Sequence, residues 1–441
     1  MPRLLLITAT AEGIRKARRT RFLNFQQITM PYLAARVPAD WKVWHLDEEA
    51  GKIDSNSIVS LNRPDVVGIT FHTPSAYHAY AMAARFRASG SCVVMGGPHV
   101  TLMPGEAAQH ADAIFVGEAE GLWEEFLRAF VAGSYRRVYQ RRDAPALDGA
   151  PMAHKALFHR RDLTNGVLFA TRGCPYHCDF CAIPVMYPHG LRKRPVEEVA
   201  AEYSSFKGKR IIFWDENIAA DREYAKQLFR AIAPLRKWWS SQASVQAARD
   251  EGLLELAARS GCKQLFLGLE SVSQSSVDGV SKGFNRVEDY SQLLSRVHGH
   301  GIAVQAGIVF GFDHDTPAIF KETIDFLEAA GVQNATFNIL TPYPGTPLFE
   351  RLERQGRILT RDWSQYNGRT DVVFQPKLMS AQELLAGFRY ANERFYSLRS
   401  IAKRLSRSPV QIGWTLPLNL AYAAKWAMSR HSSHRTQAKL G

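Results

Sequence analysis

The chain has 441 residues, of which 46% are hydrophobic and 22% are charged, and its formal net charge is +13. This length allows two or three domains with sizeable cores, and the composition excludes a globally disordered chain. The five cysteines form an odd set with three within eight positions, which disfavours a disulfide framework and favours a cytoplasmic protein with a metal site.

Residues 1–140 alternate between strand and helix patterns. Strands are predicted at 4–8, 42–46, 66–70, 92–96 and 113–116, and helices at 75–87 and 121–132. The first apolar run has no small-residue cleavage site after it, so we interpret it as a strand rather than a signal peptide. The alternation predicts a parallel sheet covered by helices, with ligands at the carboxyl ends of its strands.

Residues 141–165 are polar and contain two prolines, which indicates a linker. A second strand–helix alternation follows from 166 to 350. Its predicted strands are 166–171, 210–214, 241–245, 264–269, 303–310 and 335–340. Its predicted helices are 196–206, 222–233, 251–260, 286–300 and 316–330. Six β–α units favour a partial barrel over a complete eight-unit barrel.

Residues 351–441 are predicted to be mostly helical, with an amphipathic helix at 381–400. The apolar stretch 410–428 is interrupted by a proline and a lysine, so we do not expect it to span a membrane. Its aromatic residues are Trp414, Tyr422 and Trp426. They leave two interpretations open, which are a helix packed on the barrel and an interfacial helix on the inner face of a membrane.

Basic residues concentrate in two places, and a solvated surface or an anionic partner such as acidic lipid would explain them. The two clusters are Arg15, Lys16, Arg18, Arg19 and Arg21, and Arg399, Lys403, Arg404, Arg407, Arg430 and Arg435. No RNA-binding motif and no interleaving of aromatic and basic residues accompany them, so nucleic acid is not an expected partner.

Cys174, Cys178 and Cys181 follow a predicted strand with the spacing C-x3-C-x2-C. Three thiolates can hold three irons of a cubane cluster and leave the fourth iron free, whereas closed electron-transfer clusters use four protein ligands. Structural zinc also requires four ligands, and His177 could be the fourth, so a zinc site is the alternative.

This motif, with Phe180 before its last cysteine, resembles the radical S-adenosylmethionine (SAM) superfamily, and segments 213–217, 268–271, 307–311 and 342–347 resemble further motifs of that superfamily. The resemblance implies a [4Fe–4S] cluster whose open iron binds SAM, and reductive cleavage of SAM to a 5′-deoxyadenosyl radical. An external electron donor such as flavodoxin or ferredoxin would be needed. The implied SAM-binding residues are Phe180, Asp215, Glu216, Gln242, Glu270 and Val309.

Glycines mark three strand ends of the N-terminal region, where backbone can approach a ligand closely. Placed before a radical SAM core, these loops resemble the Rossmann-like cobalamin-binding domain of the B12-dependent class, as in hopanoid C-2 methylase and anaerobic magnesium-protoporphyrin ester cyclase. The implied cobalamin-binding residues are Thr70, His72, Thr73, Ser75, Gly96, Gly97, Pro98, His99 and Glu118. The cobalt-ligating D-x-H-x-x-G motif is absent at 8–13, so His72 or Thr73 would lie below the metal, and a vestigial domain without cobalamin is the alternative.

The resemblance therefore implies an α/β protein with a Rossmann-like cobalamin-binding domain, a partial (β/α)6 radical SAM barrel and a helical C-terminal region. It implies a cobalamin-dependent methyltransferase acting on an unactivated carbon of a small molecule, such as a lipid or tetrapyrrole. Three alternatives remain open. One is a radical SAM cyclase or oxidase without net methylation, and another is a zinc-stabilised binding protein. The third is a tRNA methylthiotransferase, which needs a second cluster although only Cys92 and Cys262 remain.

Overall fold

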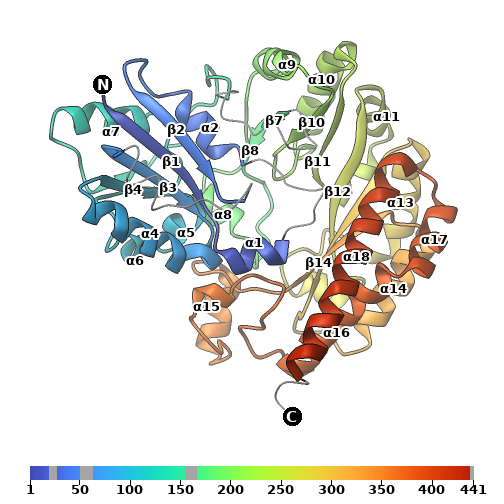
Figure 1. The fold of residues 1–441 in the computed structure, drawn as a ribbon. Helices are drawn as coiled ribbons and strands as arrows, with labels where there is room; N and C mark the ends of the chain where they lie inside the picture. The colour runs from blue at the N-terminus through green and yellow to red at the C-terminus, as the bar shows by residue number, and fades with distance from the viewer. Residues whose placement is uncertain (19–26, 50–62, 154–165, 438–441) are drawn as a thin grey trace.

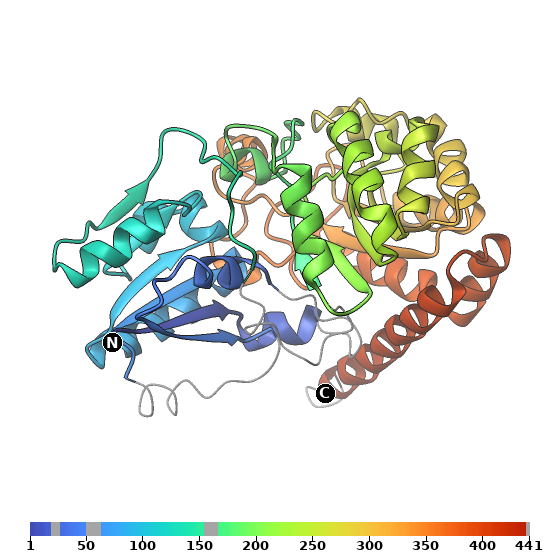
Figure 2. The same ribbon diagram turned by 90° about the horizontal axis from the view of Figure 1, so that it is seen from above.

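The computed structural model describes residues 1–18, 27–49, 63–153 and 166–437. Figure 1 shows two α/β units side by side, the first in blue and teal and the second in green to yellow. The C-terminal helices, in red, lie along the second unit, and Figure 2 shows the same arrangement from above.

The first unit is a sheet of six parallel strands in the order β2-β1-β3-β4-β5-β6. The strands are β1 Arg3–Ala9, β2 Lys42–Asp47, β3 Val66–Phe71, β4 Cys92–Gly96, β5 Ala113–Val116 and β6 Val138–Gln140. The five predicted strands are confirmed. The sixth strand, β6, was not predicted, because three residues on a sheet edge are too few to show a periodicity.

Both faces of this sheet are buried, which explains why its strands are continuous apolar runs. In β1, Leu5 and Ile7 join one core cluster, while Leu4 and Leu6 join the cluster on the opposite face. Helices cover both faces; they are α1 Glu12–Arg18, α2 Thr29–Ala34, α4 Ala76–Ala88, α5 Pro98–Leu102, α6 Pro104–Ala107 and α7 Leu122–Val131. The strand order reverses between β1 and β3, and in open parallel sheets such a reversal opens a ligand crevice at the carboxyl ends of the strands.

The second unit is a sheet of six parallel strands in the order β14-β13-β12-β11-β10-β7. The strands are β7 Gly166–Leu168, β10 Arg210–Phe213, β11 Trp238–Ser244, β12 Cys262–Glu270, β13 Ala303–Phe310 and β14 Asn334–Ile339. Neighbouring strands follow one another in sequence order, each joined to the next by a helical crossover. The predicted partial barrel of six β–α units is confirmed.

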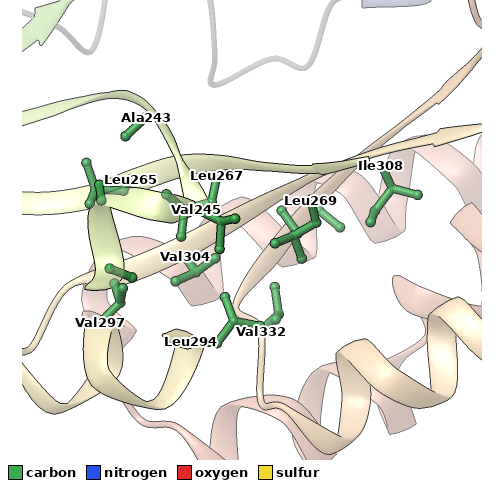
Figure 3. Close-up of a cluster of buried hydrophobic side chains, with 14 of the residues drawn as sticks. Ala243, Val245, Leu265, Leu267, Leu269, Leu294, Val297, Val304, Ile308 and Val332 are labelled. Atoms are coloured by element: carbon green, nitrogen blue, oxygen red, sulfur yellow. The ribbon is translucent and has the colours of Figure 1, made fainter. Parts of the chain in front are cut away.

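The barrel core lies between these strands and the crossover helices. The helices are α9 Val196–Ser205, α10 Arg222–Ile232, α11 Glu251–Arg259, α12 Gln274–Asp278, α13 Tyr290–Gly299 and α14 Ile319–Ala329. Figure 3 shows Leu265, Leu267 and Val304 of the strands near Leu294 and Val297 of α13. The helix predicted at 286–300 begins only at Tyr290, because 287–289 form a tighter 3-10 turn.

The C-terminal region divides between the two units. Helix α15 Pro347–Arg354 and the turn η6 Trp363–Gln365 place Phe349, Trp363 and Tyr366 in a core cluster of the first unit. Helices α16 Ala381–Phe395, α17 Leu398–Arg407 and α18 Ile412–Gln437 instead cover the barrel. The helix predicted at 381–400 ends early, because the Ser397 side chain caps the start of a new helix.

The aromatic side chains of α18 pack against the rest of the protein. The Trp414 indole N–H donates to Gln264 Oε1 at 3.0 Å, and the Tyr422 ring stacks on Tyr396 with centroids 4.7 Å apart. Trp426 lies near Phe388, with centroids 6.1 Å apart. Of the two interpretations of this segment, the helix packed on the barrel matches these contacts. Among the described residues, no helix is both long enough and apolar enough to cross a bilayer.

The C-terminal basic cluster is only partly a surface feature. Arg404 is fully buried, donates to the carbonyl oxygens of Val332 and Gln333 at 2.8 and 2.6 Å, and lies over the Phe395 ring. Lys403 forms an ion pair with Glu328 at 2.8 Å. Several residues of the two basic clusters lie outside the described side chains; they are Lys16, Arg18, Arg19, Arg21, Arg430 and Arg435.

Candidate active site

The three clustered cysteines lie on one loop, as predicted from the sequence. This loop, the cysteine loop, runs from Gly173 to Ala182, between the short strand β8 Thr171–Arg172 and helix α8 Ile183–Met186. Cys178 is buried, Cys174 and Cys181 are partly exposed, and none of the three forms a disulfide. His177, the fourth ligand of the zinc alternative, is exposed.

The chain turns into this loop because Asp215 takes over the backbone hydrogen bonds that would extend β7. The fully buried Asp215 carboxylate accepts from the backbone N–H of Ala170 at 3.1 Å and of Thr171 at 2.5 Å, and from the Thr171 hydroxyl at 2.6 Å. This competition explains why the strand predicted at 166–171 is divided into β7 and β8. Burial raises the pKa of Asp215 to about 6.

Gly173 fixes the start of the loop. Its φ of +85° is unfavourable for residues with a side chain, and an added Cβ would lie 2.2 Å from the Gly190 carbonyl oxygen. Its backbone N–H donates to Glu216 Oε2 at 3.1 Å. Burial raises the pKa of this Glu216 carboxyl to about 7.

The far side of the loop is held by the barrel and by helix α15. The Tyr176 ring stacks on Phe284 with centroids 4.1 Å apart. Asp179 accepts from Arg351 Nη1 at 2.7 Å and from Ser281 Oγ at 2.5 Å. The loop is therefore fixed at both ends by contacts with the rest of the protein.

The donor set fits an iron–sulfur cluster. Burial raises the pKa of Cys178 to about 11 and that of Cys181 to about 12, and mutual repulsion between the thiolates adds to both shifts. Cysteines with raised pKa values ionise only when positive charge lies beside them, and iron bound to the sulfur supplies that charge directly. The backbone N–H groups of Tyr176 and Ile183 favour the ionised forms of Cys174 and Cys181, which partly offsets the effect of burial on their pKa values.

A buried ion pair lies beside the cysteines. Lys282 and Glu270 are paired, with side chains 11% and 12% exposed, and the Lys282 ammonium favours the ionised form of all three cysteines. Glu270 has a φ of +68° at the point where the register between β12 and β13 shifts. Glu270 was predicted from the sequence, but Lys282 was not, because its only signal is its place in a polar stretch after the Gly268–Ser271 motif.

A cavity of about 460 Å³ lies between the two units. It brings together nine predicted residues, seven from the cobalamin set and two from the SAM set; they are Thr70, His72, Thr73, Gly96, Gly97, Pro98, Glu118, Glu216 and Gln242. The backbone of Gly97 lies very close to Thr70, because a Cβ added at Gly97 would be 2.2 Å from Thr70 Oγ1. The cavity is at the β1/β3 reversal, where the topology predicts a ligand crevice.

Much of the cavity wall is apolar, and apart from Trp214 and Tyr343, which lie in the motif segments 213–217 and 342–347, this part was not predicted from the sequence. The side chains are Leu102, Phe169, Met186, Tyr187, Trp214 and Tyr343. They come from both units and from the helix α8 that follows the cysteines. Strand and helix patterns cannot reveal which apolar residues face a space between two domains.

Six predicted residues do not line this cavity. Asp215 instead accepts hydrogen bonds where the chain turns into the cysteine loop. Ser75 accepts from the Ala11 N–H at 3.1 Å, and Glu270 forms an ion pair with Lys282. The ring centroids of Phe180 and Phe312 are 5.8 Å apart within the barrel, and Val309 is half-buried on β13. Their ligand-binding roles stay predictions.

His99, the sixth, is fully buried behind the cavity wall. Its Nδ1 lies 3.2 Å from Thr73 Oγ1 and its Nε2 lies 3.5 Å from Glu106 Oε1. Burial lowers the pKa of His99, which favours a neutral ring. His99 therefore supports the cavity residue Thr73 from behind rather than lining the cavity, and its predicted role in binding cobalamin stays a prediction.

Two family models match the two units. The radical SAM superfamily matches residues 168–327, and the B12 binding domain matches residues 15–127. A domain of unknown function, DUF4070, matches residues 346–423.

Similar proteins act on tetrapyrroles and lipids. Bacteriochlorophyllide d C-12(1)-methyltransferase from Chlorobaculum tepidum is 32% identical over 361 residues, which cover 79% of this chain and 78% of the relative. Hopanoid C-2 methylase from Rhodopseudomonas palustris is 24% identical, covering 84% of this chain and 71% of the relative. Anaerobic magnesium-protoporphyrin IX monomethyl ester cyclase from Cereibacter sphaeroides is 26% identical, covering 77% and 61%.

Solved structures share the fold at low identity. The radical SAM methyltransferase TsrM from Kitasatospora setae, with tryptophan and a SAM analogue bound, aligns over 100% of both chains with a TM-score of 0.72 and 15% identity. The cobalamin-dependent enzyme OxsB, with aqua-cobalamin and SAM bound, covers 92% of this chain and 70% of its own, with a TM-score of 0.69 and 13% identity.

Proposed function

Because this chain belongs to the radical SAM enzymes that contain a B12-binding domain, we propose that it methylates a carbon atom of a tetrapyrrole. Its cofactors are a [4Fe–4S] cluster, SAM and cobalamin. When bound, these groups supply a radical that removes a hydrogen atom from the substrate and a methyl group that replaces it. The external electron donor, with flavodoxin or ferredoxin as the expected type, is part of the proposal.

The observation that supports this function best is the shared cavity. Residues at the strand ends of the first unit line this cavity, together with Glu216 and Gln242 of the second unit. The chemistry requires SAM, the substrate carbon and cobalamin to come together in one space that excludes water. A cavity lined by both units offers such a shared space.

The apolar walls favour a large, flat and mostly apolar substrate. Trp214 and Tyr343 can pack against a macrocycle, and aromatic side chains gain most from such offset stacking. Two relatives that are each 32% identical to this chain are bacteriochlorophyllide d methyltransferases. We therefore favour a tetrapyrrole over the hopanoid lipid of the more distant methylase.

In this proposal Cys174, Cys178 and Cys181 hold the cluster. Glu216 accepts from the Gly173 N–H and faces the cavity, where it and Gln242 would hold the polar end of SAM. Thr70 and the Gly96–Pro98 turn would approach cobalamin from the first sheet. His72 and Thr73 lie on the same wall and would be nearest its lower face.

The test is turnover with labelled SAM. The protein would be purified anaerobically, reconstituted with iron, sulfide and cobalamin, and incubated with a reductant, trideuteriomethyl-SAM and a bacteriochlorophyllide. We expect the tetrapyrrole to gain the mass of one trideuteriomethyl group in place of hydrogen. A substrate that stays unlabelled while 5′-deoxyadenosine accumulates would contradict methyl transfer to tetrapyrroles.

A cyclase is the second candidate, because two magnesium-protoporphyrin ester cyclases are 26% identical to this chain. That reaction would change the mass of a protoporphyrin ester without adding deuterium. The same incubation with magnesium-protoporphyrin monomethyl ester separates the two functions.

A further inference from the structure

Two arginines face each other next to the cysteine loop. Strands β8 and β9 (Arg192–Lys193) form an antiparallel hairpin in which Arg172 is paired with Arg192. Figure 1 shows β8 between the two units. Like charges directly opposite each other on a hairpin repel, so this pair needs anionic partners.

The partners come from the other unit. Glu118 and Glu120 lie on the loop between β5 and α7 of the first sheet. Glu118 bridges both arginines, with its two oxygens 2.6 Å from Arg172 Nη1 and 2.5 Å from Arg192 Nη2. Glu120 also contacts Arg172 Nη1, at 2.5 Å. We call these four side chains the interdomain clamp.

The interdomain clamp is largely dry and balanced in charge. Its four side chains are between 8% and 18% exposed, so water screens their attraction only weakly. Burial alone would raise the pKa of Glu120, but the attraction and hydrogen bond of Arg172 lower it below its usual value. The two negative charges of the carboxylates therefore balance the two positive charges of the guanidinium groups.

The clamp acts where the two halves of the site meet. Arg172 directly precedes Gly173, the residue that fixes the cysteine loop, and lies two positions before Cys174. Glu118 directly follows Gly117, and Arg172, Gly117, Glu118 and Glu120 all line the cavity. A movement of the first sheet relative to the barrel would pull on the cysteine loop through Arg172.

We propose that Arg172 is a positioning residue that sets the geometry between the cobalamin-binding loops and the cluster, through its ion pairs with Glu118 and Glu120. This inference rests on the proposed function, because it requires both cofactors. It also changes the predicted role of Glu118, since both of its carboxylate oxygens are already engaged by arginines. Arg192 is the second guanidinium of the interdomain clamp. Its Nη1 also donates to the Pro145 carbonyl oxygen at 2.9 Å, which connects the clamp to the segment between the two units.

The test measures the geometry between the cofactors without needing a substrate. In reconstituted protein, the reduced cluster and cob(II)alamin are both paramagnetic, and the cluster accelerates the spin relaxation of the cobalt to an extent that depends on their separation. The variants are Arg172→Gln and Arg172→Lys, and the control is Arg136→Gln, which removes an exposed pair with Glu125 elsewhere in the first unit.

We expect Arg172→Gln to bind iron, sulfide and cobalamin at wild-type stoichiometry but to lose the relaxation enhancement. Arg172→Lys should recover part of it, and the control should keep all of it. A residue with a merely stabilising role would lower cofactor content or thermal stability and leave the enhancement per loaded molecule unchanged. Unchanged enhancement in fully loaded Arg172→Gln would therefore overturn the proposal.

A second measurement distinguishes a failure of the proposed function from a failure of the proposed role of Arg172. If wild-type protein binds no cobalamin, the proposed function fails, and hydrogen exchange of the cluster-loaded protein then tests the clamp. We expect Arg172→Gln to speed amide exchange in residues 117–120 and in residues 173–181 together. Faster exchange in only one of these segments, or in neither, would show that the clamp does not couple the two units. Glu120→Gln, which leaves Arg172 in place, should give a smaller change in the same two segments.

Discussion

The carboxylate of Asp215 accepts hydrogen bonds from both the backbone N–H and the hydroxyl of Thr171. These bonds replace the strand pairing that β7 would otherwise continue, and they place the next residues on the cysteine loop. A residue that the sequence suggested as a SAM ligand thus shapes the loop that carries the three cysteines.

Replacing Asp215 with asparagine should therefore impair the loop more than it impairs SAM contacts. The amide nitrogen of asparagine cannot accept from the N–H groups of Ala170 and Thr171, which leaves at least one buried donor unpaired at a cost of about 1–3 kcal/mol. We expect a lower free energy of unfolding and less iron per chain after reconstitution. Thr171→Val, which removes only the hydroxyl bond, should have a smaller effect. An Asp215→Asn variant with full iron content and weaker SAM binding would instead support direct ligation.

Gly173→Ala should prevent assembly of the cluster. The positive φ costs about 1–2 kcal/mol for a residue with a side chain, and the added Cβ would also collide with the Gly190 carbonyl. The matched control is Gly190→Ala, which also has a positive φ but has nothing within 4 Å of its added Cβ. Iron and sulfide analysis should show a loss in Gly173→Ala and near-normal content in the control. Equal content in both variants would contradict the steric argument.

Lys282→Met should destabilise the cluster-free protein by about 3–5 kcal/mol, because it leaves the buried Glu270 carboxylate without its partner. The double variant Lys282→Met/Glu270→Gln should recover part of that loss, since it removes both charges. Denaturant unfolding measures the free energy. Lys321→Met, which breaks an exposed pair with Asp325, serves as the control and should change little. A loss no larger than that of the control would mean that water reaches the Lys282–Glu270 pair.

The contribution of His298 to the stability of the protein should fall as the pH drops from about 6.5 to about 4, whereas the raised pKa values of Asp215 and Glu216 act in the opposite direction. Burial lowers the pKa of His298 from 6.5 to about 4, so this ring is neutral in the folded state and gains a proton on unfolding within that range. Its contribution is complete above pH 6.5 and is lost as the pH falls through the folded-state value, by roughly 3 kcal/mol in total. The unfolding free energy of the wild type minus that of His298→Asn should therefore fall by about this amount between about pH 6.5 and about pH 4. A difference that stays constant over this range would contradict the role of His298.

The sequence predicted the elements well because their patterns are local. All five strands of the first sheet that had at least four residues were found, and β13 was predicted at its observed bounds. The loop cysteines were equally visible, because short spacers place three thiols together in any fold. Element ends were less accurate where a side chain from elsewhere intervenes, as Asp215 does at Thr171.

What the sequence could not predict depends on contacts between distant residues. Lys282 lies near the cysteines only because the segment after α12 packs on their loop, and Trp363 reaches the core of the first unit from far along the chain. Glu118 was predicted as a cofactor contact, but the arginines that engage it come from the other unit. Such partners carry no signal in spacing or periodicity.

The central claim is a [4Fe–4S] cluster on Cys174, Cys178 and Cys181 with one iron open to SAM. The most direct measurement is the electron paramagnetic resonance spectrum of the reduced, reconstituted protein before and after SAM is added, with Cys178→Ala as the control. We predict a cluster signal that shifts on addition of SAM in the wild type and is absent in the variant. A cluster signal that SAM leaves unchanged, or reconstituted protein that contains zinc and no iron, would contradict the account.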